Sequence, residues 1–295
     1  MKLLFVLLLF FNSVILNAEK ITSYPYLSGD TWRDFCDWKL DQEIRFLPKK
    51  VKRGDTIFVP FSQLTRFQKH YLPQIKHKFI LISANYEYKA DSPHPGLYGE
   101  ILRNEKVVAW FLQNFDGNPS SKIVPIPIGI ANNEWPHGNV DLLTQFIKTP
   151  LYDRENKILA YVNFLVNSNI KEREPCINYF SQMPWAHIAS ERSFEEYLSD
   201  LKHTYFVISP PGHGEDCHRT WEALYMGCYP VVKHSTLDSL YEGLPVVCVN
   251  DWNEVTLEFL LEKQSEFSAK SWAFEKLYAR YWFNKVRAIQ RKLRK

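Results

Sequence analysis

Short apolar runs alternate with segments of helical period from about residue 30 to the end of the chain. The apolar runs have the length and the β-branched content of buried strands. The segments between them fit helices that cover a sheet. This alternation is typical of βαβ units stacked around parallel sheets, so we expect an α/β protein.

The runs fall into two groups. In the first half, strands are predicted at residues 56–60, 78–83, 107–114 and 122–130, with helices around 30–40, 62–75 and 97–104. In the second half, strands are predicted at residues 157–164, 185–190, 204–210, 229–234 and 245–251. The polar stretch Thr149–Asn156 is the expected hinge. We therefore predict two Rossmann-like domains facing a central cleft, at residues 19–150 and 151–295.

The last helix is predicted from Ser271 to about Leu293. Apolar residues on it keep the three-and-four spacing of one buried face: Phe274, Leu277, Tyr278, Tyr281, Trp282, Val286 and Ile289. Its end carries several cations: Lys285, Arg287, Arg291, Lys292, Arg294 and Lys295. These cations either form a solvated helix end that complements the helix dipole, or contact anionic lipid or an acidic acceptor at the membrane periphery.

The first eighteen residues have the pattern of a secretory signal. A single lysine precedes an unbroken apolar run at residues 3–11, and Ala18 offers a cleavage position. Because Asn12 and Ser13 interrupt the run before it reaches spanning length, a retained anchor is the second choice. We expect a secreted or lumenal protein, with a membrane-anchored form as the alternative.

Composition narrows the functional classes. With 295 residues and 45% hydrophobic content, the chain can bury a core for two modest domains. Its 36 basic and 33 acidic residues leave a net charge of only +3, which argues against a nucleic-acid partner. The five cysteines are widely spaced and include no C-x-x-C pair, so buried thiols are expected rather than a disulfide framework.

The richest chemistry lies between residues 204 and 232. A buried strand runs into the turn PPGHGEDC, in which Gly212 and Gly214 allow a ligand to approach the backbone closely. A helix begins near Asp216, and its free amides suit a diphosphate, so we expect Gly214 and Asp216 among the donor-binding residues. Arg219 and Glu222 share a face of this helix, where they would clamp phosphate oxygens and accept the ribose hydroxyl protons.

The same residues carry a family resemblance. The order of strand, glycine-rich turn and R-T-W-E-A-L-Y-M-G-C-Y-P-V-V, residues 219–232, resembles the donor-binding core of exostosin-type glycosyltransferases. The resemblance is specific over about thirty residues and implies a GT-B fold, with residues 19–150 binding the acceptor and 151–295 the nucleotide-sugar donor. It also implies that Glu222 contacts the donor ribose and that the reaction inverts the anomeric centre.

One position departs from that pattern. Many GT-B enzymes have a second acidic residue eight positions before the ribose-binding glutamate, where this chain has Gly214. Glu215 and Asp216 are displaced toward the helix, so no sugar contact is transferred to Glu215.

Further donor contacts are predicted nearby. The loop at residues 163–174 follows the first strand of the second domain and offers Asn163 and Arg173, and His213 lies in the glycine-rich turn. Turn and surface roles remain alternatives for these residues. His213, Cys217 and His218 could hold zinc, but the chain lacks a D-x-D pair and a second cluster at ligand spacing, so we expect neither a metal nor a cofactor other than the nucleotide sugar as co-substrate.

The acceptor side needs a general base. The loop at residues 85–99 offers Glu87, Asp91 and His94, each also explained as a solvated loop residue. The loop at residues 126–138 adds asparagines and Trp135, which fit either a sugar-facing surface or an ordinary turn.

We therefore expect a glycosyltransferase that moves a sugar from a nucleotide-diphosphate donor to a hydroxyl of a glycan or similar acceptor. A fucosyltransferase-like enzyme with a GDP donor and a non-catalytic carbohydrate-binding protein on the same fold remain the alternatives. Binding of different nucleotides separates the first two, and donor turnover separates both from the third.

Overall fold

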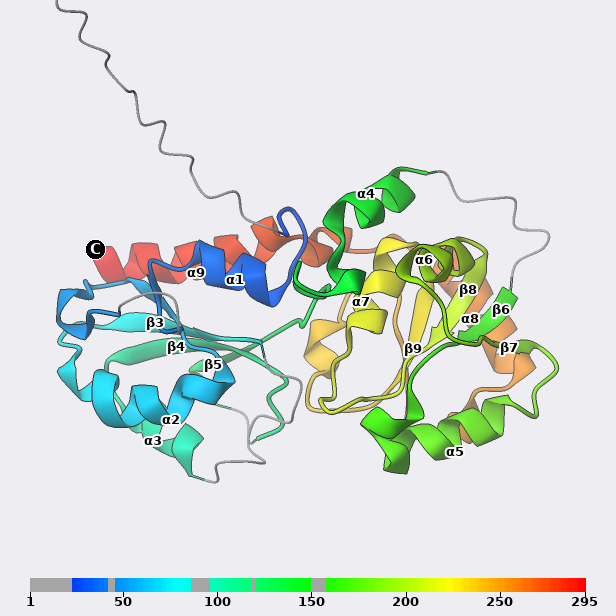
Figure 1. The fold of residues 1–295 in the computed structure, drawn as a ribbon, viewed down its shortest axis with the longest axis horizontal. Coiled ribbons are helices and arrows are strands. Elements are labelled where there is room, and N and C mark those ends of the chain that lie inside the picture. The colour runs from blue at the N-terminus through cyan, green and yellow to red at the C-terminus, as the bar shows by residue number, and fades with distance from the viewer. Residues whose placement is uncertain (1–22, 42–45, 86–95, 118–119, 150–157) are drawn as a thin grey trace, which may run out of the picture.

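The structure, a computed structural model, describes residues 23–41, 46–85, 96–117, 120–149 and 158–295. These residues form two parallel five-stranded sheets, one in each half of the molecule (Figure 1). Each strand predicted from the sequence is present at its expected place, which confirms the α/β class.

The N-terminal sheet adds its strands in one direction. Its order is β1 (Trp38–Lys39), β2 (Thr56–Phe58), β3 (Phe79–Ser83), β4 (Val107–Gln113) and β5 (Ile123–Ile126). Because parallel crossovers are right-handed, connections that progress in one direction place their helices on one face. That face carries α2 (Leu64–Arg66) and α3 (Leu97–Arg103), and the opposite face needs another cover.

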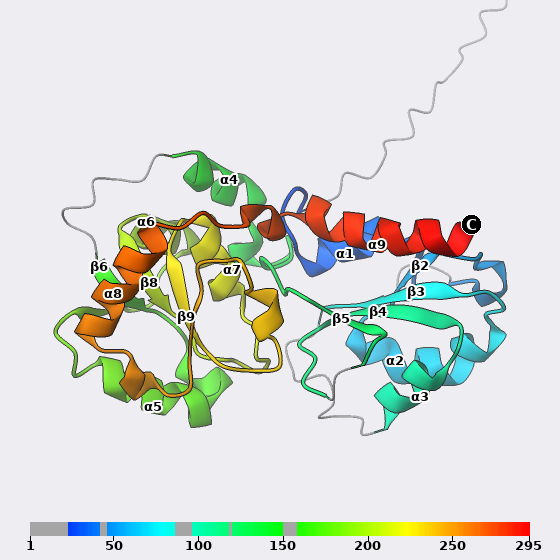
Figure 2. The ribbon, with the colours of Figure 1, turned by 180° about the vertical axis from the view of Figure 1, so that it is seen from behind.

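Two helices from distant parts of the chain cover the opposite face. They are α1 (Gly29–Phe35) and α9 (Ala279–Arg294), which lie along the N-terminal sheet in both views (Figures 1 and 2). Phe283 stacks on Phe35 with ring centroids 3.9 Å apart and meets Trp32 edge-on at 5.7 Å. The C-terminal helix is therefore part of the N-terminal core.

This placement corrects the predicted division of the chain. The division assigned all of residues 151–295 to the second domain, but α9 packs on the first sheet. Conversely, α4 (Val140–Lys148) precedes the predicted boundary but packs against α6 (Phe194–Lys202) of the second half. The last helix begins at Ala279 rather than at Ser271, after a 3-10 helix at Phe274–Leu277. Its predicted apolar face holds for Trp282 and Val286; in the 3-10 helix, Leu277 is buried and Phe274 is exposed.

The C-terminal sheet has a different order, because the first strand of this half along the chain lies inside the sheet rather than at its edge. The order is β10 (Val247–Val249), β9 (Tyr229–Lys233), β8 (Thr204–Ile208), β6 (Ile158–Val162) and β7 (Ala186–Ile188). Helices α6 and α7 (His218–Tyr225) cover one face, and α5 (Ile170–Phe180) and α8 (Leu257–Ser268) cover the other. All five cysteines are free thiols, as the sequence predicts.

The helix ends follow local sequence signals. Ser193 and Glu196 form a capping box at the start of α6, and Thr256 accepts a backbone bond at the start of α8. Gly227, with φ +78°, follows the end of α7 in the left-handed region that favours glycine. Among the described helices, none is both long and apolar enough to cross a membrane.

Candidate functional site

The candidate site lies where the order of the C-terminal sheet reverses. The chain adds β7 on one side of β6 and then crosses back to add β8 on the other side. In open α/β sheets, ligands bind at such a switch point, beyond the carboxyl ends of the strands. The loop after β6 leads into α5 and the glycine-rich turn after β8 leads into α7. Neither helix has a side-chain cap at its N-terminus, so both N-terminal turns suit an anion.

Arg173 braces the glycine-rich turn against the loop after β6. Its Nε donates to the Pro211 carbonyl at 2.9 Å and its Nη1 donates to the Leu165 carbonyl at 2.8 Å. A Cβ at Gly212 would lie 2.8 Å from Nη2 of Arg173, so glycine permits this close contact. Arg173 is only 5% exposed, so it mainly supports the turn and places its charge underneath it.

Arg219 brings a second cation to the same place. Its Nε donates to the Asn163 carbonyl at 2.8 Å, and both guanidinium groups lie over the ring of Phe164. Among the described residues, neither arginine forms an ion pair with a carboxylate. Burial and the neighbouring Arg219 lower the pKa of Arg173. A bound anion would therefore relieve a real electrostatic cost.

Glu222 lies one helical turn after Arg219. The side chain is 5% exposed, and its Oε1 is buried without a hydrogen-bond partner. Burial raises the pKa of Glu222 to about 7, against the opposing effects of Arg219 and the Tyr197 hydroxyl. The Tyr197 hydroxyl lies near Glu222 but outside hydrogen-bond geometry, so both groups are buried without a hydrogen-bond partner. An unpaired buried carboxylate oxygen is costly, and a ligand hydroxyl would satisfy it.

The structure gives Asp216 a different role from the donor contact predicted for it. The residue is 2% exposed, and its carboxylate accepts bonds from Trp221 Nε1, from Tyr241 and from the Ile128 amide at 2.8 Å. Its own amide donates to Asn114 Oδ1 at 2.8 Å. Since Asn114 and Ile128 belong to the N-terminal half, Asp216 joins the two halves. Burial raises its pKa to about 6, and these hydrogen bonds oppose the shift.

Other contacts bring the carboxyl ends of the two sheets together. His218 Nδ1 lies 2.8 Å from the Gly129 carbonyl, and Thr236 Oγ1 donates to the Phe115 carbonyl at 2.8 Å. Gly129 has φ +68°, and a Cβ there would lie 2.1 Å from the Leu27 carbonyl oxygen. The loops after β4 and β5 therefore lie against the start of α7.

An aromatic path leads from α7 to the surface of the N-terminal half. The ring centroids of His137 and His218 lie 6.3 Å apart, and Trp135 stacks on His137 with ring centroids also 6.3 Å apart. The Trp135 side chain is 53% exposed. Trp135 is thus an exposed ring connected to the candidate donor site through two histidines.

A polar cluster lies beside this loop. Asp30 Oδ2 accepts from the Asn133 amide at 3.0 Å, and Asn132 accepts from the Asp30 amide and donates to Asn85 Oδ1, both at 3.0 Å. Burial raises the pKa of Asp30. The sequence-predicted bases Glu87, Asp91 and His94 follow Asn85 and lie outside the described residues.

The remaining predicted donor residues surround the turn. Asn163 is half-buried and its Nδ2 donates to the Ser190 carbonyl at 3.0 Å, whereas His213 is exposed and Gly214 is buried. The fold therefore brings Asn163, Arg173, Arg219 and the glycine-rich turn into one region.

One potential metal-ligand group occurs among the described residues, and it differs from the combination of His213, Cys217 and His218. It consists of His234, Asp238 and Cys248, whose ligand atoms lie within 4.8 Å of one another. His234 Nδ1 already lies 2.6 Å from Asp238 Oδ2, and Asp238 also accepts from the Ser235 amide. This pairing is explained as a turn without an ion.

Several contributors were not predicted from the sequence. Phe164, Asn169 and Tyr197 acquire their roles only through tertiary contacts, since Asn169 Nδ2 donates to the Gly212 carbonyl at 2.8 Å from 43 residues away. For Phe164 and Asn169, the one signal in the sequence is their position in the loop between β6 and α5.

Comparison with known proteins gives one match to a family model. Residues 155–294, slightly less than half of the chain, match the RXYLT1 C-terminal domain, a xylosyltransferase-related family. The search among curated proteins found no match. The exostosin-type resemblance has no counterpart in these comparisons.

One similar solved structure is UDP-GlcNAc 2-epimerase from Methanocaldococcus jannaschii. The sequences are 11% identical, and the alignment covers 73% of this chain and 70% of the epimerase with a TM-score of 0.34. A likeness of this size carries no functional inference.

Proposed function

We propose that the protein is a glycosyltransferase that binds a nucleotide-diphosphate sugar at the switch point of its C-terminal sheet. The observation that carries the proposal is the pair of arginines without carboxylate partners, next to two uncapped helix N-termini. The match of residues 155–294 to a xylosyltransferase-related family supports the same class of reaction.

Each half of the donor nucleotide has a matching group. The diphosphate would bind to Arg219 and to the N-terminal turn of α7, while the buried Arg173 supplies a long-range charge. The amides of Gly212, Asp216 and Cys217 already donate within the protein, so they are not part of this contact. The ribose hydroxyls would donate to the unpartnered Oε1 of Glu222. His213 and Asn163 stand at the edge of this site, where they can contact the sugar or a phosphate.

The acceptor would bind from the N-terminal half. Trp135 offers a face for sugar stacking, and Asp30 offers a carboxylate beside it. Asp30 joins Glu87, Asp91 and His94 as a candidate for the base that deprotonates the acceptor hydroxyl. We further propose that the deprotonated acceptor attacks directly from the side opposite the diphosphate, which inverts the anomeric centre. Transfer would require neither metal nor cofactor, because the two arginines can neutralise the leaving diphosphate.

The first experiment measures thermal stabilisation by UDP, GDP and CMP and then donor turnover with the corresponding sugar nucleotides, with and without EDTA. We expect one nucleoside diphosphate to raise the melting temperature and its sugar to be transferred or slowly hydrolysed in EDTA. A GDP preference favours the fucosyltransferase-like alternative. Binding without turnover favours a carbohydrate-binding protein, and the absence of nucleotide binding contradicts the proposal.

A further inference from the structure

The outer face of α9 is strongly basic. The helix contains no acidic residue, and its exposed side chains include Arg280, Lys285, Arg287, Arg291, Lys292 and Arg294. Its apolar side is buried against the N-terminal sheet. Arg287 and Arg294 lean toward α1, where they line a hollow, and the other four cations do not line it. Cations near the C-terminus also complement the helix dipole, but that effect is limited to the last turn.

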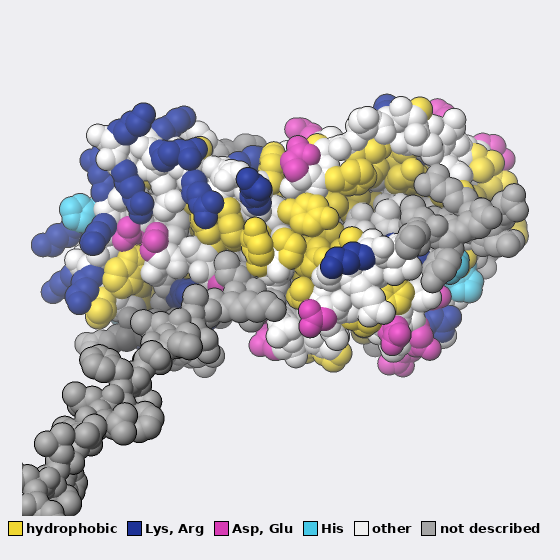
Figure 3. Space-filling model, turned by 90° about the horizontal axis from the view of Figure 1, so that it is seen from above, with side chains coloured by type: hydrophobic (Ala, Val, Ile, Leu, Met, Phe, Trp, Pro, Cys, Tyr) yellow, Lys and Arg dark blue, Asp and Glu magenta, His cyan; other side chains and the backbone are white. Residues whose placement is uncertain are grey.

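The fold places a second basic segment beside the end of this helix. The loop at residues 48–53 has the sequence PKKVKR, and Lys49, Lys50, Lys52 and Arg53 are exposed. Arg53 Nε donates to the Leu293 carbonyl, and Gln290 Nε2 donates to the Gly54 carbonyl at 3.0 Å. Two segments more than 200 residues apart thus form one surface, named here the basic face. Figure 3 shows the concentration of Lys and Arg at this end of the molecule.

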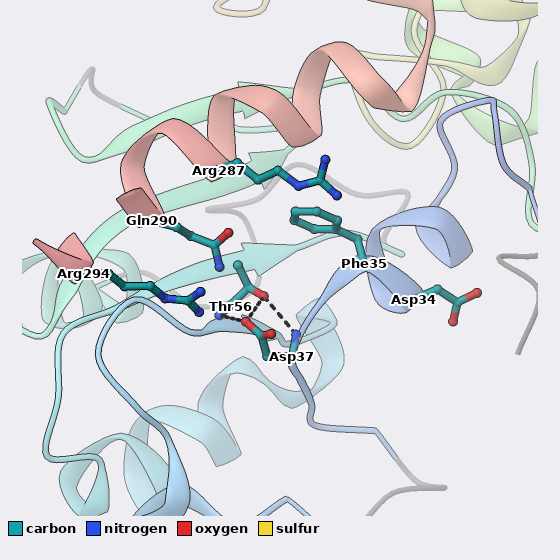
Figure 4. Close-up of a pocket in the computed structure, with 7 residues that line it drawn as sticks. All are labelled: Asp34, Phe35, Asp37, Thr56, Arg287, Gln290 and Arg294. Atoms are coloured by element: carbon teal, nitrogen blue, oxygen red, sulfur yellow. Dashed lines mark hydrogen bonds between the residues drawn. The ribbon is translucent and has the colours of Figure 1, made fainter. Parts of the chain in front are cut away.

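Among the described residues, the salt bridge that joins the basic face to an acid is the one between Arg294 and Asp55. Asp55 is 8% exposed and accepts from Trp38 Nε1 and the Lys52 amide, both at 2.8 Å, besides its 3.5 Å ion pair with Arg294. Asp37 accepts from both the amide and the hydroxyl of Thr56. Asp37 lines a hollow of about 340 Å³ between α1 and α9 (Figure 4). Arg287 and Arg294 line the same hollow, whereas the other cations of the basic face do not.

The other end of α9 is aromatic and joins the N-terminal part of the chain. Tyr24 is 47% exposed and Phe274 is 43% exposed. The Ala279 amide, at the start of α9, donates to the Pro25 carbonyl at 3.0 Å. The first described residues, which follow the apolar run at residues 3–11 in the sequence, therefore lie against the start of α9. Tyrosine and tryptophan are enriched at membrane interfaces, and clusters of Lys and Arg attract anionic headgroups.

We propose that the basic face docks on an anionic lipid surface. The net charge of the chain is only +3, so this concentration of cations is a local feature rather than a property of the whole protein. Acidic headgroups would pair with the cations of α9 and residues 48–53 while Tyr24 and Phe274 enter the interface. The switch-point site would then remain accessible, because it lies on the other half of the molecule. This proposal does not depend on the identity of the transferred sugar or on transfer itself.

The test compares lysine acetylation in the full-length protein mixed with phosphatidylcholine vesicles or with vesicles that also contain phosphatidylglycerol. We expect Lys50, Lys52 and Lys292 to react about fivefold more slowly with the anionic vesicles, and this protection to disappear in 0.5 M NaCl. Lys69 and Lys171, exposed on the α2 and α5 side of the molecule, serve as internal controls and should react equally in both. Equal reaction of all five lysines overturns the proposal.

A charge-reversal variant provides the second arm. Lys49→Glu, Lys50→Glu and Lys292→Glu together should abolish the protection of Lys52 and leave the melting temperature unchanged, because these side chains are exposed. The matched control carries Lys69→Glu, Lys76→Glu and Lys171→Glu and should keep the protection. Protection by a soluble sulfated polysaccharide but not by anionic vesicles would replace the lipid proposal with a polyanionic glycan.

Discussion

The guanidinium groups of Arg173 and Arg219 lie over the same aromatic ring, with their Cζ atoms 5.5 and 5.4 Å from the centroid of Phe164. The two cations repel each other, and each is held in place by backbone carbonyls rather than by acids. Such an arrangement costs folding free energy, which an anionic ligand would recover. This relationship connects the architecture of the switch point to nucleotide binding.

The pKa of Glu222 predicts how stability depends on pH without ligand. Because burial raises it from 4.5 to about 7, the folded state keeps a proton that the unfolded state releases between these values. The stability that the retained proton of Glu222 contributes to the folded state is therefore full below pH 4.5, and it is lost as the pH rises through about 7. Urea unfolding should show Glu222→Gln gaining stability over the wild type across this range, by at most about 3 kcal/mol. A difference that does not change with pH would contradict the burial of an ionisable Glu222.

Asp216 should act on stability more than on nucleotide affinity. In Asp216→Asn, an amide group replaces an acceptor that faces Trp221 Nε1 or the Ile128 amide, which leaves buried donors unsatisfied. We expect a loss of about 2–4 kcal/mol in the free energy of unfolding. Calorimetric binding below the transition should show only a modest loss of nucleotide affinity. A loss as large as that of Arg219→Ala would instead assign Asp216 to the donor site.

Trp135 should act on the acceptor alone. Because its ring is exposed, Trp135→Ala should change the free energy of unfolding by less than about 0.5 kcal/mol. If the ring stacks on the acceptor, KM for the acceptor should rise about 3- to 10-fold while KM for the donor stays constant. Trp135→Phe should keep the KM for the acceptor close to that of the wild type, because it retains an aromatic ring. Equal changes in both KM values would count against an acceptor role.

Phe283 tests whether α9 belongs to the N-terminal core. The ring is 4% exposed and packs between Phe35 and Trp32. Phe283→Ala should lower the free energy of unfolding by about 3–5 kcal/mol. Hydrogen exchange should accelerate in β3 and β4 of the N-terminal sheet in this variant. Faster exchange confined to the C-terminal sheet would contradict the observed packing.

The sequence predicts the strands well because each has a distinct buried run, such as residues 204–208 or 79–83. It did not predict β1, because a two-residue edge strand leaves no periodic pattern. The apolar stripe of α9 predicts that the helix packs on something, but only the one-directional order of the first sheet shows which face lacks a cover. A domain boundary predicted from the polar stretch at residues 149–156 therefore could not show that α9 returns to the N-terminal sheet.

The candidate site is predictable to a similar extent. Arg219 and Glu222 could be chosen because one helix fixes their spacing, and the glycine-rich turn marks the position of the loop. The role of Asp216 could not, since its partners Asn114 and Ile128 lie 102 and 88 residues away. The same holds for Arg173, because the fold brings to it the carbonyls of Pro211 and Leu165, the Ser168 hydroxyl and the Cys217 sulfur.

The most direct test of the donor site is calorimetric titration of the wild type, Arg219→Ala and the exposed control Arg280→Ala with the nucleoside diphosphate that stabilises the protein best. We predict that Arg219→Ala weakens binding by about 10- to 100-fold, as expected for a lost charge-assisted contact, and that Arg280→Ala binds like the wild type. Unchanged affinity in a folded Arg219→Ala variant would contradict the account.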